Sequence, residues 1–270
     1  PQTKAKAELI NNKYFRRALS LAINRQRIID AVYNGLGTPC QNLPEPSSIF
    51  HEPDIFTKFT EYDPQTANRL LDELGLANRD FEGYRTFPDG SRMTFFHNTG
   101  GAANAGISQF VVDDWAAVGL RVLIRTQGAA LFDTEFKALK HEIDWWSGNG
   151  SFPMLDPDPY VPTGRAQYGY GFGQWYFRGG LYGDPNVKRL PGAIEPPPGH
   201  PLRRAMEIYD DAAEEMDSLR QKAIFSEAIR MSIDNLWSMN IATAPPQLVI
   251  VKNGFRNVPR KGIETFHLQS

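Results

Sequence analysis

The chain has 270 residues, and its content of 41% hydrophobic, 12% aromatic and 22% charged residues is typical of a globular protein rather than a disordered or fibrous one. Its 29 basic and 31 acidic residues leave a net charge of -2, so no basic excess indicates a surface for nucleic acid or an anionic membrane. A mean hydropathy of -0.42, without an apolar stretch of about 18–20 residues, argues against membrane-spanning helices. The single cysteine, Cys40, excludes an intramolecular disulfide and a cysteine-cluster metal site.

The first part of the chain predicts an amphipathic helix at residues 12–34, an irregular loop at 36–61, a helix at 63–75 and a strand–turn–strand hairpin at 81–98. Gly35 is suited to the left-handed residue that follows a helix end. Asp63 and Pro64 form a typical helix start, because an aspartate caps the free N–H groups and proline fits the first helical position. Asp89 and Gly90 mark the hairpin turn.

The second part alternates between helical and extended patterns. It predicts helices at 104–118, 131–139, 202–216 and 218–235, and strands at 121–125, 143–146 and 247–251. Helices and strands that alternate over short links favour an α/β layer with some parallel pairing. The length corresponds to one large domain or two modest ones.

Residues 145–182 are unusually aromatic and poor in charge, with eleven aromatic and four charged side chains. The many glycines argue against regular helix in this segment. Such a long aromatic loop either packs into its own domain as a lid on the core, packs on another domain, or lines a binding cleft. The composition leaves these interpretations open.

Enzyme motifs are weak. The five histidines have no metal-ligand spacing, and the chain contains neither a serine-nucleophile elbow nor a phosphate-binding loop, so no cofactor is expected. Asp156 and Asp158 could divide acid and base roles in a carbohydrate-active hydrolase. The prolines beside them favour turns, in which both aspartates cap backbone N–H groups instead. A module that docks a partner protein through its aromatic loop is a further alternative.

Four segments, residues 15–39, 62–76, 87–90 and 113–122, resemble in order the C-terminal half of the family 5 extracellular solute-binding proteins, the peptide, nickel and oligosaccharide receptors of ABC importers. The resemblance implies an α/β fold, the C-terminal lobe of a two-lobed periplasmic-binding-protein fold with a mixed sheet flanked by helices. It implies a ligand-binding lobe at residues 1–244 and a tail at 245–270 that returns to an N-terminal lobe. Because the chain starts at Pro1 without a signal-peptide pattern, we expect it to be a segment of a longer polypeptide.

The same resemblance implies a function without catalysis. A small solute, first of all a peptide or peptide-like one, would bind in the cleft between the lobes and be delivered to the permease. An oligosaccharide receptor of the same family is the alternative. The implied partners are the ligand and the ABC permease subunits, with no nucleic acid, and the protein is expected to be a monomer. The implied location is the periplasm or, with a lipid anchor, the cell surface.

The candidate ligand-binding residues are Trp145, Trp146, Asn149, Asp156, Asp158, Tyr168 and Trp175. In peptide-binding relatives a Gly-Trp step precedes an aspartate that pairs with the ligand's ammonium group; here Trp146 resembles the tryptophan and Asn149 stands in the place of the acid. An amide cannot supply the negative charge, although it still donates and accepts hydrogen bonds. Asp156 and Asp158 resemble the family's Asp-Pro-Asp step, with residues 151–155 as an apparent insertion.

Overall fold

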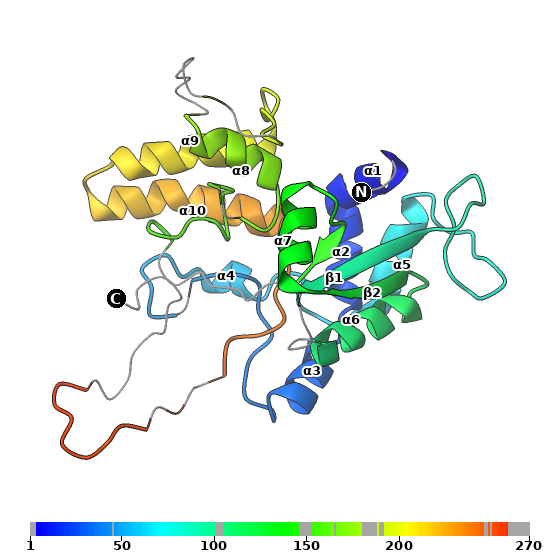
Figure 1. Cartoon of the computed structure of the whole chain (residues 1–270), viewed down its shortest axis with the longest axis horizontal. Helices are drawn as coiled ribbons and strands as arrows, with labels where there is room; N and C mark the ends of the chain where they lie inside the picture. The colour runs from blue at the N-terminus through cyan, green and yellow to red at the C-terminus, as the bar shows by residue number, and fades with distance from the viewer. Residues whose placement is uncertain are drawn as a thin grey trace.

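The computed structural model describes residues 4–44, 46–100, 105–145, 153–164, 166–179, 188, 192–245, 248 and 250–258. A part that contains the sheet and a part made of helices lie side by side (Figure 1). The helices are α1 (Lys4–Asn11), α2 (Lys13–Ala22), α3 (Arg25–Val32), α4 (Pro53–Phe56), α5 (Pro64–Glu73), α6 (Ala105–Ala117), α7 (Ala129–Lys137), α8 (Tyr170–Phe177), α9 (Pro201–Glu214) and α10 (Ser218–Asn235). The strands are β1 (Thr94–Gly100), β2 (Arg121–Gln127) and β3 (Ile143–Asp144).

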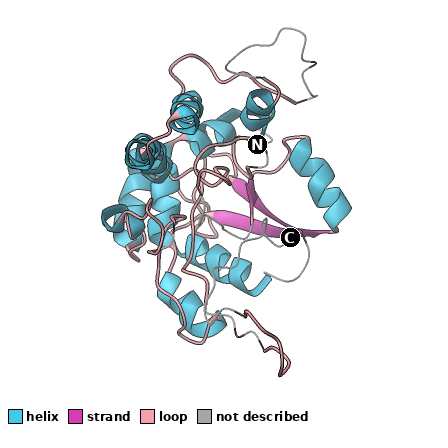
Figure 2. Cartoon of the chain, turned by 90° about the vertical axis from the view of Figure 1, so that its left-hand side faces the viewer, coloured by secondary structure: helices cyan, strands magenta, loops and turns pink. Residues whose placement is uncertain are grey.

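The described strands form one parallel sheet in the order β2-β1-β3. Figure 2 shows the two longer strands lying among the helices. Successive side chains of a strand point to opposite faces, so β1 presents His97 to α6, where its ring contacts Ser108, and places Gly100 under Phe132 of α7. The expected mixed sheet is thus parallel in its described strands, and antiparallel pairing is found there in isolated bridges such as Pro39 with Ala242.

The first hydrophobic core joins the sheet to α2, α5 and α6. Phe15 of α2 contacts Phe95 of β1, with ring centroids 5.6 Å apart. The predicted start of α5 is confirmed, because Asp63 accepts a hydrogen bond from the Thr66 N–H at 2.9 Å. Local capping signals therefore position this helix correctly along the chain.

The single helix predicted at residues 12–34 is wrong, because the chain leaves helical geometry at Ile23 and Asn24 and forms α2 and α3. The Asn24 side chain caps the Arg27 N–H at 3.1 Å, and its own N–H donates to Asp114 at 2.8 Å. Arg25 turns inward and donates to the carbonyls of Ser20 and Asn240, both at 2.8 Å. The hydrogen bonds with the distant residues Asp114 and Asn240 outweigh the continuous apolar spacing.

The hairpin predicted at residues 81–98 is only partly present. The turn at Gly90 forms, but the two arms meet in a single antiparallel bridge between Thr86 and Arg92. The chain then enters β1, which pairs in parallel with β2 and β3 rather than with the preceding arm. An isolated two-stranded hairpin is only marginally stable, whereas the seven-residue pairing with β2 makes β1 part of a three-stranded sheet.

A second hydrophobic core lies among α8, α9, α10 and the loops that contain Phe50 and Tyr160. Helix α8 contradicts the expectation that the glycine-rich aromatic segment avoids regular helix. Its glycines permit close packing: a Cβ at Gly173 would lie 3.0 Å from the Gly164 nitrogen, and one at Gly171 would lie 3.0 Å from the Gly192 carbonyl oxygen. Tertiary packing here outweighs the low helix propensity of glycine.

The last described residues form a loop that projects from the helices and the sheet and turns back (Figure 1). Of the strand predicted at residues 247–251, the described residues Leu248, Ile250 and Val251 belong to no strand, and the other two lie outside the described residues. Among the described helices, none has the length and apolarity that a bilayer crossing requires. The described residues also contain no cluster of histidine, cysteine and acidic side chains suited to a metal ion.

Candidate functional site

The carboxyl ends of the three parallel strands lie at one edge of the sheet. Ligands of α/β proteins bind beyond this edge, where loops leave the strands and backbone groups are available. Here β1 ends at Gly100, β2 ends at Gln127, and Trp145 follows β3 directly. This edge is therefore the candidate site.

A row of polar residues crosses the sheet just before this edge. Asn98 on β1 is paired in register with Arg125 on β2 and Asp144 on β3. Asn98 is only 1% exposed, and neither its amide nitrogen nor its amide oxygen has a hydrogen-bond partner in the described part of the chain. Burial raises the pKa of Asp144, while a contact with His141 opposes this effect. The row thus contains a buried amide with unused donors and acceptors.

Helix α7 packs on this face of the sheet, and two more polar groups lie beside it. Gln127 donates to Glu135 of α7, whereas its amide oxygen is buried without a partner among the described residues. The His141 ring packs on Phe132 with centroids 4.6 Å apart, and its Nδ1 lies 3.4 Å from Asp144. The other ring nitrogen of His141 is likewise buried and without a partner.

Of the predicted tryptophans, Trp145 lies at this edge, half-buried against the first core. Trp146 and Asn149 lie outside the described residues. The prediction that Trp146 and Asn149 contact the ligand therefore stays a prediction.

The two predicted aspartates lie in the helical part of the chain, on the loop that leads to α8. The Asp158 carboxylate accepts hydrogen bonds from the Thr163 N–H at 2.9 Å and from the Thr163 hydroxyl at 2.6 Å, which is the turn-capping role expected from the flanking prolines. Burial raises the pKa of Tyr160 well above its usual value, and the nearby Asp156 carboxylate adds a smaller effect in the same direction.

Tyr168 stacks on Trp237 with centroids 5.9 Å apart. Burial, with a smaller contribution from Asp158, raises the pKa of Tyr168 well above its usual value. Trp175 of α8 is 5% exposed and belongs to the second core, with the Arg203 guanidinium 5.4 Å from its ring. The structure therefore places Asp158 and Tyr168 close together, Trp175 in the core beside them, and Trp145 against a different core.

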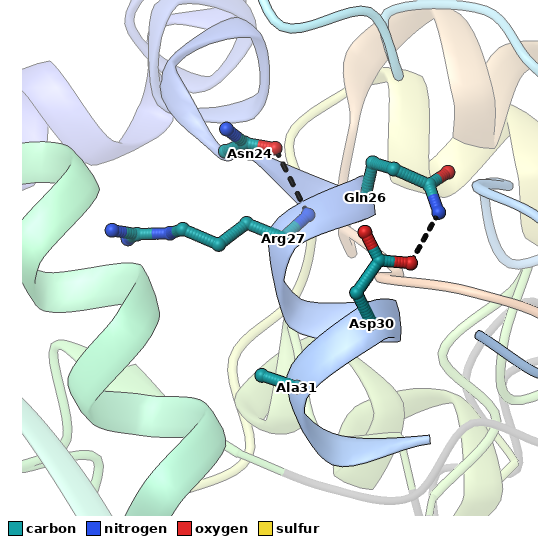
Figure 3. Close-up of a pocket in the computed structure, with 5 residues that line it drawn as sticks. All are labelled: Asn24, Gln26, Arg27, Asp30 and Ala31. Carbon is teal, nitrogen blue, oxygen red and sulfur yellow. Dashed lines mark hydrogen bonds between the residues drawn. The ribbon is translucent and has the colours of Figure 1, made fainter. Parts of the chain in front are cut away.

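Two hollows on the surface lie at α3 rather than at the edge of the sheet. The larger, of about 580 Å³, is lined by Asn24, Gln26, Arg27, Asp30 and Ala31 (Figure 3). Its polar groups already have partners: Gln26 donates to Asp30 at 2.8 Å, and Arg27 pairs with Asp114 at 2.7 Å. The second, of about 500 Å³, lies between α3 and the segment that includes Thr38 and Tyr62. Because the groups of the larger hollow stabilise the fold, the edge of the sheet remains the better candidate.

Asn98, Gln127 and His141 are not among the ligand-binding residues predicted from the sequence. The first two lie near the carboxyl ends of strands that the sequence did predict, so the position of ligand sites in parallel sheets could have drawn attention to them. No local pattern marks His141.

The model of the bacterial extracellular solute-binding proteins, family 5 Middle, matches residues 2–172. The chain is 30% identical over 158 residues to the di/tripeptide-binding protein 1 of Pseudomonas aeruginosa, which covers 55% of this chain and 26% of that protein. It is 28% identical over 170 residues to the dipeptide-binding protein of Escherichia coli, covering 60% of this chain and 29% of that protein. The chain thus spans less than a third of the length of these relatives.

Solved structures agree in fold. The oligopeptide-binding protein OppA superimposes with a TM-score of 0.76 and 28% identity over 87% of this chain and 38% of that one. The periplasmic binding protein MelB of Agrobacterium fabrum, solved with stachyose, superimposes with a TM-score of 0.70 and 18% identity over 88% of this chain and 34% of that one. The resemblance of residues 15–122 to this family is confirmed. The chain belongs to the bacterial extracellular solute-binding proteins of family 5.

Proposed function

We propose that this chain is the C-terminal lobe of an ABC-importer receptor, which binds a peptide or peptide-like solute and delivers it to the permease. The observation that carries the proposal is the match to OppA over 87% of this chain, at 28% identity. The two relatives with the di- and tripeptide-binding names support the same ligand class. The receptor acts without catalysis, as a monomer in the periplasm or at the cell surface.

The ligand would lie between the carboxyl edge of the sheet and a second lobe that this chain does not contain. Trp145, Trp146 and Asn149 are proposed to contact the ligand, together with Asp156, Asp158 and Tyr168 from the loop that leads to α8. Trp175 is proposed to support that loop from the core, since its ring is buried. Aromatic side chains suit this role because they offer a large contact area at low entropic cost.

The tail that starts at residue 245 is proposed to return to the second lobe. Its described apolar side chains Leu248, Ile250 and Phe255 are 88%, 86% and 70% exposed. Several large apolar side chains exposed along one short segment are costly in water and are typical of a contact surface. The second lobe would cover them.

A receptor for oligosaccharides is the second candidate. Asn149 in place of an acid removes the charge that would pair with a free amine, and the fold is shared with MelB, solved with stachyose. The hydrolase alternative is weaker, because the Asp158 carboxylate already accepts two hydrogen bonds from its own turn and the relatives named above are binding proteins.

Differential scanning fluorimetry of the full-length receptor tests the proposal. The probes are trialanine, its N-acetylated C-terminal amide, and stachyose. A ligand that binds only the folded state raises the free energy of unfolding by about 2.7 kcal/mol at a concentration one hundred times its Kd. A shift with either alanine peptide supports the peptide class, and a shift with stachyose alone supports the second candidate. No shift with any probe at millimolar concentration contradicts the proposed function.

A further inference from the structure

Asn98 has an unusual environment for a buried amide. Asn98 lies in the middle strand of the sheet, and its side chain is only 1% exposed. Neither the nitrogen nor the oxygen of the side-chain amide has a hydrogen-bond partner within the described part of the chain. Buried amides almost always have partners, because an unmet donor or acceptor loses its hydrogen bonds to water without compensation. The Asn98 side chain is therefore an exception, which a partner from outside the described residues would resolve.

The groups around Asn98 have similar unmet capacity. The amide oxygen of Gln127 and one ring nitrogen of His141 are also buried without a partner among the described residues. Phe132 of α7 lies against Gly100 and His141, and Gln127 donates to Glu135 of the same helix. Asn98 lies on the same face of β1 as Gly100, because alternate residues of a strand share a face. Three unmet polar groups around one helix, at the edge where parallel sheets bind ligands, indicate a common occupant.

The charged side chains near this cluster already have contacts of their own. Glu135 accepts the hydrogen bond from Gln127, and the Arg125 guanidinium lies 4.1 Å from the centroid of the Phe96 ring. Burial disfavours the charged form of Asp144, whose pKa is raised. The unmet groups themselves are an amide, an amide oxygen and an imidazole nitrogen. Such groups match an uncharged partner with both donors and acceptors.

We propose that Asn98 is a specificity-determining residue that contacts an uncharged amide or hydroxyl group of the solute, with Gln127 and His141 beside it. This inference rests on the proposed function and deepens it. The contact between Asn98 and the solute would then not depend on the charged ends of the ligand. Both amide atoms of Asn98 are buried in this structure, so the groups around them would have to move for the solute to reach them. The contact would then be made in the liganded receptor and lost in the empty one.

If Asn98 has this role, replacing it with an apolar residue should stabilise the empty receptor and weaken ligand binding. Asn98→Leu replaces the amide by an apolar group of the same branching, which removes an unmet polar group from the empty receptor. We expect the unliganded full-length receptor to melt about 2 °C or more higher. We also expect its affinity for the alanine peptides to fall about tenfold, because one hydrogen-bonded contact is lost. Asn98→Val is the second variant. Valine is smaller than leucine and is favoured in strands, so it shows whether any loss of stability in Asn98→Leu comes from overpacking.

Thr99→Val is the matched control. Thr99 is the next residue on β1, is 2% exposed and points to the opposite face, where its hydroxyl lies 3.3 Å from that of Thr126. We expect Thr99→Val to leave affinity within twofold. Isothermal titration calorimetry with trialanine and with its N-acetylated C-terminal amide measures the affinities, and fluorimetry measures Tm.

The outcomes separate the two proposals. A lower Tm in both Asn98→Leu and Asn98→Val would overturn the inference, because it would show that the amide has partners in the empty receptor. Unchanged affinity in both variants would also overturn it, while binding by the unaltered receptor would uphold the proposed function. A loss confined to trialanine would show that Asn98 contacts a charged end, which overturns the assignment to an uncharged group. If no probe binds the unaltered receptor, the proposed function fails, and the comparison of Tm still decides whether Asn98 is unsatisfied.

Discussion

Lys6 and Glu142 form an ion pair in which the ammonium nitrogen lies 2.8 Å from a carboxylate oxygen, with only 8% and 2% of the two side chains exposed. The other oxygen of Glu142 accepts the Phe96 N–H of β1 at 2.9 Å. The ammonium group also lies 5.4 Å from the centroid of the Phe96 ring. This pair therefore ties α1 to the sheet, although 136 residues separate the partners in the chain.

Removal of the Lys6 ammonium group should destabilise the fold. We expect Lys6→Met to lower the free energy of unfolding by about 3–5 kcal/mol, because the Glu142 carboxylate would remain buried beside an apolar side chain. Urea denaturation measures the change as a lower midpoint with an unchanged m value. Lys4→Met is the control, since Lys4 faces Glu8 at 3.8 Å on the exposed side of the same helix. An equal shift of the midpoint in both variants would contradict a special role for the buried pair.

A side chain at Gly119 is predicted to be destabilising. It follows α6 with a φ of +85°, and a Cβ there would overlap the Arg79 guanidinium. That group donates to the Gly83 carbonyl at 2.8 Å and to the Asn68 side chain at 3.1 Å. We expect Gly119→Ala to cost about 2–4 kcal/mol, from backbone strain together with lost hydrogen bonds, measured by urea denaturation.

The control for Gly119 is Gly90→Ala. Gly90 has a similar φ of +79° but nothing within 4 Å of a Cβ. It should lose only the strain energy of a left-handed alanine, about 1–2 kcal/mol. If the two variants lose the same stability, the contact with Arg79 contributes nothing.

Elements with local signals could be predicted from the sequence, and elements held by distant partners could not. Helix α5 carries its own cap and proline, so Asp63 and Pro64 mark its start without tertiary information. The break between α2 and α3 depends on Asp114 and on the Asn240 carbonyl, which lie far along the chain. Helix α8 depends on close packing of Gly171 and Gly173 against loops that the sequence does not place.

The candidate site shows the same division. The composition of residues 145–182 indicates an aromatic surface, but it does not distinguish half-buried Trp145 from Trp175 in the core. The polar row at Asn98 depends on strand register, because only the pairing with β2 and β3 brings Arg125 and Asp144 beside it. A pattern of residue types carries no register between strands that are distant in the sequence.

His97 should make the fold sensitive to acid. Burial lowers its pKa to about 4, against 6.5 for an exposed histidine, so the unfolded chain binds the proton more readily. The stability that the neutral ring supports is fully present above pH 6.5 and is lost as the pH falls towards 4, in total about 3 kcal/mol.

The comparison variant for His97 is His97→Gln, which retains a polar group near Ser108. The raised pKa of Asp144 acts in the opposite direction, since its proton is held more tightly in the folded state. It acts equally in both proteins, so the difference between their stability curves isolates His97. Urea denaturation between pH 4 and 7 should show a shallower decline for the variant. Parallel curves would contradict the assignment.

Substitution of Trp175 tests whether this ring supports the fold or contacts the ligand. Its ring is 5% exposed in the second core, so Trp175→Phe should lower the free energy of unfolding by about 1–3 kcal/mol through lost packing. Affinity of the full-length receptor for trialanine should stay within twofold. Phe177→Ala, at a 65% exposed position on the same helix, should change stability by less than about 0.5 kcal/mol. A tenfold loss of affinity in Trp175→Phe with unchanged stability would instead place this ring at the ligand, as its position in the aromatic segment first indicated.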